Sequence, residues 1–200
     1  AHKPLPGVTR IVLEHRRAAE LMMRHLYQLG HRPIAFMRGQ SFSSDSDDRW
    51  KSLTTVAKDL GLEIQPELVV RLQLNLSSPE LGYPVVPQLL ATKRPFTALV
   101  AYNDISAIGA IRALRDHGLR VPEDVSVIGF DDIQGAAYHT PSLTTIRQPL
   151  NSMGNTAARI LLQRIRNGPN QEYPEQIPIV PELIIRESTM PPNPGRLKKK

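Results

Sequence analysis

Polar side chains follow three short apolar runs of the sequence, and they are the first candidates for chemistry. The dipeptides Asn103-Asp104 and Asp131-Asp132 each come directly after such a run, and the polar stretch 38–49 follows a third. Amide and carboxylate groups hold ligand hydroxyls, and paired carboxylates can also act as acid and base. In open α/β sheets, ligands bind at the carboxyl ends of the strands. The pattern therefore predicts a small-molecule site at one sheet edge.

The same residues give little support for catalysis. Asp131 and Asp132 are adjacent on a strand end, so we expect their side chains to point in opposite directions. The sequence has no GxSxG elbow, no P-loop and no GxGxxG, and its six histidines show no metal-ligand spacing. The absence of cysteine excludes disulfides, zinc-thiolate sites and iron–sulfur clusters. We expect no enzyme, no metal and no cofactor.

Each polar group also has an explanation that needs no ligand. Asp104 precedes an expected helix and would cap it, and the loop 41–48 alone is typical of a solvated turn. The repetition of polar groups after several apolar runs nevertheless favours a binding site.

Strands and helices alternate along the chain and would position these groups. The expected strands lie at 9–13, 33–37, 67–74, 97–102, 125–130, 143–146 and 182–186, and the expected helices at 17–29, 47–60, 78–92, 104–117 and 152–167. This alternation is typical of βαβ units. It predicts an α/β fold with parallel sheets and helices on both faces.

Composition and charge narrow the function class further. The chain is 40% hydrophobic and 22% charged, which excludes a disordered protein. No apolar run approaches the ~20 residues of a membrane span, and the start has no signal-peptide core, so we expect a cytoplasmic protein without membrane contact. The net charge is +6, but four of the positive charges lie in the last five residues. We interpret 191–200 as a solvated basic tail rather than a nucleic-acid-binding arm.

Several motifs in a fixed order resemble the LacI/GalR (lactose-repressor) family of bacterial transcription regulators. The longest is LVAYNDISAIGAIRALRDHGLRVPEDVSVIGFDD, at 99–132. It is preceded by RHLYQLGHRPIAF and SSPELGY, and followed by PSLTTIRQPL, MGNTAARILLQRI and PELIIREST. The resemblance extends from residue 11 to residue 189.

The resemblance implies the fold of type I periplasmic binding proteins, in which two Rossmann-like subdomains enclose the ligand. The chain would cross between the subdomains near Arg32, Gln148 and Pro178. Residues 1–32 would be the remnant of an incomplete N-terminal subdomain, 33–146 and 179–190 the C-terminal subdomain, and 147–178 the crossover and the returning helix. The family's helix-turn-helix and the first strands of its N-terminal subdomain have no counterpart in this sequence.

The resemblance also implies a set of effector-contacting residues. Arg49, Asn103 and Asp131 fall on contact positions, Ser43 and Asp45 on a loop that varies with the ligand, Arg17 where some sugar-binding members carry an acid, and Ser77 where several members place a stacking aromatic ring. Because serine has no ring, we do not expect the effector simply to copy those members' sugar or purine.

Arg49, Asn103 and Asp131 together would suit a neutral polyhydroxyl ligand, sugar-like or nucleoside-like. The guanidinium offers a planar fork of donors, the carboxylate accepts hydroxyl hydrogens, and the amide does both. A second interpretation stays open, in which Arg49 and Asp131 form a salt bridge that ties the loop to the sheet.

The function implied is the effector-binding and dimerisation core of a LacI-type regulator, whose missing helix-turn-helix domain would bind operator DNA. Ligand binding would close the cleft and shift a two-state equilibrium. The candidate surfaces for the homodimer are the helix after Ser77, with Val85, Val86, Leu89 and Leu90, and the exposed side of the 104–117 helix, unless these residues are core. The alternatives are a periplasmic sugar-binding receptor of a transporter and an enzyme on a similar scaffold.

Overall fold

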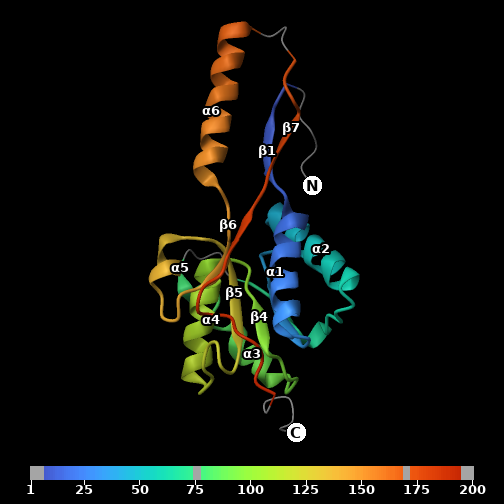
Figure 1. Cartoon of the computed structure of the whole chain (residues 1–200), viewed down its shortest axis with the longest axis vertical. Coiled ribbons are helices and arrows are strands. Elements are labelled where there is room, and N and C mark those ends of the chain that lie inside the picture. The colour runs from blue at the N-terminus through green and yellow to red at the C-terminus, as the bar shows by residue number, and fades with distance from the viewer. Residues whose placement is uncertain (1–6, 74–77, 169–171, 195–200) are drawn as a thin grey trace.

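The computed structural model describes residues 7–73, 78–168 and 172–194. Figure 1 shows a body built around a six-stranded sheet with helices on both faces, and an extension made of one long helix and a pair of strands. Within the described ranges, no helix is both long enough and apolar enough to cross a membrane.

The sheet of the body has the strand order β3-β2-β4-β5-β6-β8. Its strands are β2 (Ile34–Arg38), β3 (Val69–Arg71), β4 (Ala98–Val100), β5 (Ser126–Asp131), β6 (Thr144–Arg147) and β8 (Glu182–Ile184). All pairs are parallel except the antiparallel pair of β6 and β8. The predicted α/β fold with a mostly parallel sheet is confirmed, and the central strands are continuous apolar runs because both faces are covered.

Helices cover the two faces of this sheet as separate layers. One face carries α1 (His15–Leu29) and α2 (Ser44–Asp59), and the other carries α3 (Val85–Ala91), α4 (Asp104–Asp116) and α5 (Gln134–Tyr138). Within β2, Ile34 and Phe36 belong to the core under α1, whereas Ala35 and Met37 belong to the core under α4. This alternation follows from the period of two along a strand.

Helix α4 begins with a reciprocal cap between Asn103 and Ser106. Asn103 Oδ1 accepts a 2.9 Å hydrogen bond from the backbone N–H of Ser106, and Ser106 Oγ accepts one of 3.1 Å from the backbone N–H of Asn103. The prediction that Asp104 caps this helix is therefore wrong. Asn103 has the extended backbone that a cap requires, whereas Asp104 is already the first helical residue and is fully buried.

Two predicted elements are shorter in the structure. The helix expected over 78–92 is divided into a 3₁₀ turn, η2 (Pro79–Leu81), and α3. Gly82 lies between them, and a Cβ there would be 1.9 Å from the backbone oxygen of Ser106, so the chain bends where it touches α4. Of the strand expected over 67–74, the first residues form a 3₁₀ turn, η1 (Pro66–Leu68), and residue 74 lies outside the described ranges.

The extension consists of β1 (Arg10–Leu13), β7 (Gln176–Ile179) and α6 (Leu150–Asn167). β1 and β7 pair in parallel, and Figure 1 shows them rising beside α6 from one end of the body. β7 was not predicted, and its QIPI run contains a proline, a residue that is unusual inside a strand. In α6, Ile160 is buried, whereas Leu161, Leu162 and Ile165 are exposed.

Helix α1 belongs to the body. The expectation grouped it with the rest of residues 1–32, in the remnant of the N-terminal subdomain. Met23 and Leu26 are fully buried in the same core as Phe36 of β2. The chain passes between extension and body at three places: between β1 and α1, between β6 and α6, and between β7 and β8.

The apolar residues of α3 are core rather than a free surface. Val85, Val86 and Leu89 are at most 2% exposed, and Leu90 packs against the same core. The prediction that they form a dimerisation patch is wrong, because the helix turns its apolar side towards α4 and the sheet.

Candidate functional site

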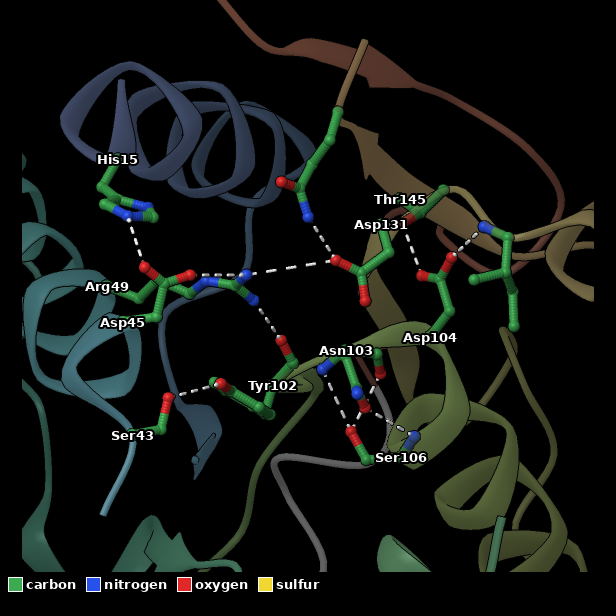
Figure 2. Close-up of polar contacts among 12 residues, drawn as sticks. His15, Ser43, Asp45, Arg49, Tyr102, Asn103, Asp104, Ser106, Asp131 and Thr145 are labelled. Carbon is green, nitrogen blue, oxygen red and sulfur yellow. Dashed lines mark hydrogen bonds and ion pairs between the residues drawn. The ribbon is translucent and has the colours of Figure 1, made fainter. Parts of the chain in front are cut away.

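Arg49 lies at the centre of the candidate site, on α2 and close to the carboxyl ends of β4 and β5 (Figure 2). Its Nη1 donates to the backbone oxygen of Tyr102 at 3.1 Å and its Nη2 to Asp45 Oδ2 at 3.3 Å. The guanidinium carbon lies 3.8 Å from the centre of the Phe130 ring. These contacts fix the orientation of the guanidinium fork, and the Arg49 side chain is 13% exposed.

Asp131 ends β5 and faces Arg49. Its Oδ1 accepts a 2.6 Å hydrogen bond from Gln148 Nε2 and lies 4.0 Å from Nη2 of Arg49. Burial raises the pKa of Asp131, and the nearby charge of Arg49 opposes that effect. Asp132 is instead held by Arg147 and Arg186, each at 2.6 Å, as expected for carboxylates that point in opposite directions.

The backbone is unusual at both of these aspartates. The φ angle is +118° at Asp131 and +56° at Asp132. Residues other than glycine rarely adopt such angles, and those that do are concentrated at functional sites. The angles turn the chain at the end of β5, so the two carboxylates diverge.

Asp45 joins α2 to the first turn of α1. Its Oδ1 lies 3.4 Å from Nε2 of His15, and its Oδ2 accepts the bond from Arg49. The hydrogen bond with His15 is the largest cause that lowers the pKa of Asp45, and Arg49 adds to it. An ionised, half-exposed carboxylate therefore faces the space between body and extension.

Asn103 and Ser43 border the site but are partly engaged within the protein. The Oδ1 of Asn103 serves the cap of α4, so its Nδ2 amide is the group best placed to contact a ligand, as a donor. The Oγ of Ser43 lies 3.4 Å from the Tyr102 hydroxyl, and Figure 2 shows both beside Arg49. Asn103 was expected to act as both donor and acceptor towards a ligand. Because its oxygen is engaged in the cap, it offers mainly a donor.

One expected contact residue, Arg17, is not brought to Arg49. Arg17 is half exposed and its described partner is Glu20, 3.5 Å away on the same helix. Ser77 lies outside the described residues.

Four buried polar atoms around Arg49 have no hydrogen-bond partner among the described residues. They are Nδ1 of His15, Nε of Arg38, Oγ of Ser46 and Nε of Arg49. All four residues line one cavity of about 20 Å³, which has room for one water molecule. Leaving a buried polar group unpaired costs about 1–3 kcal/mol. Such a concentration indicates a place that water or a ligand completes.

A larger cleft opens beside this cavity, between the extension and the body. It has a volume of about 520 Å³, within the range of small-molecule sites. His15 and Asp45 line it from the body, and β1, Gln148 and Met153 line it from the other side. No group of three or more His, Asp or Glu residues in the described part of the chain could hold a metal ion. The site can both donate hydrogen bonds to ligand hydroxyls and accept hydrogen bonds from them.

Sequence reasoning missed four residues of this site: His15, Tyr102, Phe130 and Gln148. His15 and Gln148 follow the ends of β1 and β6, so the rule of inspecting residues after each strand would have found them if it had been applied to those strands. Tyr102 and Phe130 were assigned only to apolar runs, and no local signal marks them as partners of an arginine.

Comparison with known proteins identifies the family. Residues 23–189 match the model of the periplasmic binding protein-like domain. The chain belongs to this family. Its relatives within the family are LacI/GalR-type regulators, so the resemblance seen in the sequence is confirmed. The transcriptional repressor PurR of Haemophilus influenzae KW20 is 39% identical over 170 residues, which are 84% of this chain and 49% of that protein.

Solved structures of the family give the same result. A LacI family transcriptional regulator from Enterococcus faecium with bound ribose is 30% identical, with a TM-score of 0.82 over 94% of this chain and 68% of that one. A dimeric Lac repressor is 28% identical, with a TM-score of 0.84 over 95% of this chain and 67% of that one. The chain spans about half the length of the curated relatives it matches.

Proposed function

We propose that this chain is the effector-binding core of a LacI-type transcriptional regulator. The observation that carries the proposal is the convergence of Arg49 and Asp131, from α2 and β5, beside a cavity lined by buried polar atoms that have no partner within the described ranges. A ligand that bridges the body and the extension would hold the cleft closed. Closure of the cleft would bias the orientation of a DNA-binding domain elsewhere in the full-length protein.

The effector is a small polyhydroxyl molecule, either a sugar or a nucleoside. The support is chemical, because Arg49 donates, Asp131 accepts and Asn103 offers its amide. The ribose bound by the Enterococcus faecium regulator is of this class. Arg49, Asn103, Asp131, Ser43 and Asp45 are the proposed contact residues, together with His15, which lines both the cavity and the cleft.

A thermal-shift screen of sugars and nucleosides tests the effector class. A ligand present at 100 times its dissociation constant adds about 2.7 kcal/mol to the free energy of unfolding. We expect at least one member of the panel to raise the Tm of the chain and Arg49→Ala to abolish the rise. A panel without any such ligand contradicts the proposed class.

Homodimerisation is proposed through the outer side of α4 and the adjoining α5 segment. A groove of about 520 Å³ runs there, lined by Ile108, Ile111 and Leu119 together with Arg112 and Arg115. Tyr138, at the end of α5, is 80% exposed. We expect sedimentation equilibrium to detect a dimer that Ile108→Asp weakens. A monomer at high concentration would contradict this interface.

In the full-length regulator, a helix-turn-helix domain would bind operator DNA in the cytoplasm. This follows the PurR relatives, which are HTH-type transcriptional repressors. The subdomain assignment is proposed in the same way, with β1, β7 and α6 as the described part of the N-terminal subdomain. The competing function, a periplasmic receptor for a transporter, predicts a secretion signal instead of a DNA-binding domain in the gene.

A further inference from the structure

Two arginines occupy matching positions on adjacent parallel strands beside the site. Arg38 is the last residue of β2 and Arg71 the last of β3, and their Cα atoms are register partners. Their side chains are 23% and 29% exposed, so both are partly buried. Like charges on neighbouring strands repel each other, so the pair requires a negative charge nearby.

A single carboxylate is shared by this pair. Asp47 Oδ1 lies 3.4 Å from Nη2 of Arg38 and 3.8 Å from Nη2 of Arg71. Asp47 is 63% exposed, and water weakens ion pairs made by such a group. In the part of the chain that the structure describes, these two positive charges thus pair with one solvated negative charge.

The arginine pair also has a hydrogen-bond donor without an acceptor among the described residues. Arg71 Nη1 donates a 3.4 Å bond to the backbone oxygen of Gly39, but the buried Nε of Arg38 has no partner among the described residues. Burial and the charge of Arg71 both lower the pKa of Arg38, as expected when a positive group is incompletely neutralised. The geometry offers donors and positive charge to an oxyanion.

Arg38 is the member of the arginine pair that borders the effector site. Arg38 lines the same cavity as Arg49, and its guanidinium carbon lies 4.8 Å from the centre of the Trp50 ring. The sheet order places β4 between β5, which carries Asp131, and β2, which carries Arg38. Adjacent strands are about 4.8 Å apart, so the ends of β5 and β2 are about 10 Å apart. A sugar with one further substituent spans that distance.

On the basis of the proposed effector function, we propose that Arg38 and Arg71 bind an acidic group of the effector, a carboxylate or a phosphate. The effector is then a sugar acid or a sugar phosphate. Its hydroxyls contact Arg49, Asn103 and Asp131. Its oxyanion replaces the carboxylate of Asp47 as the partner of the two arginines. The planar forks of the two arginines match the oxygens of either group.

Sugars that differ at a single group test the inference. Calorimetry measures the binding of six sugars to the 200-residue chain: glucose, glucuronate, glucose 6-phosphate, galactose, galacturonate and galactose 6-phosphate. Acetate and inorganic phosphate serve as minimal anions. The variants are Arg38→Gln, Arg71→Gln and Arg38→Lys. Arg94→Gln is the matched control, because Arg94 pairs with Glu67 at 3.1 Å outside the site and is 57% exposed.

We expect at least one acidic sugar to bind at least ten-fold more tightly than its neutral counterpart. Arg38→Gln and Arg71→Gln should each remove that preference, Arg38→Lys should keep part of it, and Arg94→Gln should leave it unchanged. A preference for the acid or for the phosphate distinguishes the two oxyanions. The inference is overturned if no acidic probe shows binding that depends on Arg38 and Arg71.

Arg49→Gln separates this inference from the proposed function. If neutral sugars bind through Arg49 without any acidic preference, the effector site stands and the anion site fails. If acidic probes depend on Arg38 and Arg71 but not on Arg49, the anion site stands and its assignment to the effector cleft fails. Tm values within a few degrees of wild type show that each variant is folded.

Discussion

The Nη2 atom of Arg49 and the Oδ1 atom of Asp131 lie 4.0 Å apart, close enough for their charges to interact but too far for a hydrogen bond. Each atom has a nearer partner, since Nη2 of Arg49 donates to Asp45 at 3.3 Å and Oδ1 of Asp131 accepts from Gln148 at 2.6 Å. Such a separation between a donor and an acceptor fits a ligand hydroxyl that contacts both.

Replacing either residue should therefore impair binding more than folding. We expect Arg49→Ala and Asp131→Ala each to weaken binding of a sugar identified in the screen by about 2 kcal/mol, roughly 30-fold, because a desolvated polar group of the ligand is left unpaired. Calorimetry measures the binding, and urea unfolding of the unliganded chain measures stability.

A double-mutant cycle on the unliganded chain distinguishes the salt-bridge interpretation. If the two residues mainly bind ligand, their coupling in the free energy of unfolding should stay below about 0.5 kcal/mol. A coupling several times larger, with affinity reduced only in proportion to stability, would establish a structural salt bridge instead.

Asp104 should make the chain less stable as the pH rises. Its Oδ1 accepts a 2.5 Å bond from Thr145 and its Oδ2 a 2.9 Å bond from the backbone N–H of Ile133, but burial outweighs them and raises its pKa to about 6. The folded chain therefore binds this proton more tightly than the unfolded chain. The stabilising contribution is complete below about pH 4 and is lost as the pH rises through 6, a change of about 3 kcal/mol.

Asp104→Asn is the matched variant for this effect. The amide can accept from Ile133 and donate to the Thr145 hydroxyl, which reverses its role. We expect urea unfolding to show that the stability of the variant relative to wild type increases between pH 4 and pH 6. A difference that does not change with pH would contradict the assignment.

His31 should produce the opposite pH dependence. Its Nε2 lies 2.9 Å from the carbonyl of Met190, which can only accept, so Nε2 carries the proton and Nδ1 accepts from the Thr97 hydroxyl. Burial lowers the pKa of His31 from 6.5 to about 4. Stability due to this group is present above about pH 6.5 and is lost as the pH falls towards 4, by about 3 kcal/mol. His31→Gln should remove this loss in urea unfolding measured across that range; an unchanged loss would assign it to another group.

The exposed face of α6 should make the isolated chain associate. Leu161 and Ile165 are 60% and 71% exposed on the same helix. We expect Leu161→Gln with Ile165→Gln to reduce concentration-dependent light scattering while leaving Tm nearly unchanged. Ile160→Gln is the control, because Ile160 is 9% exposed and its replacement should lower Tm. Equal scattering by the double variant and wild type would exclude this face as the contact.

The layers of the fold were predictable because they follow from periodicity. The buried runs around β4 and β5 and the amphipathic stretch of α1 are continuous signals, and Gly30, with φ +101°, ends α1 as predicted. Features that depend on tertiary contacts were not predictable. The split before α3 depends on Gly82 approaching Ser106, and β7 forms despite its proline because β1 lies beside it.

The candidate site was predictable in part. Arg49 and Asp131 were identified because a strand end and a polar loop must share the sheet edge, and the structure brings them together. The sequence could not distinguish Asn103 from Asp104 as the cap, because either residue type serves and only the backbone decides. The Arg38–Arg71 pair depends on the register of β2 and β3, which no local pattern specifies.

The two left-handed aspartates at the end of β5 have an evolutionary consequence. Holding a residue other than glycine at such angles costs about 1 kcal/mol or more, and glycine relieves most of that cost. At Asp132 the ion pairs with Arg147 and Arg186 oppose an exchange for glycine. Asp131 has no comparably close cation among the described residues, so a population selected only for thermal robustness would tend to exchange Asp131 for glycine. The persistence of the Asp131 carboxylate in natural variants would then measure how strongly selection maintains its contacts, against a gain in stability that a single codon change makes available.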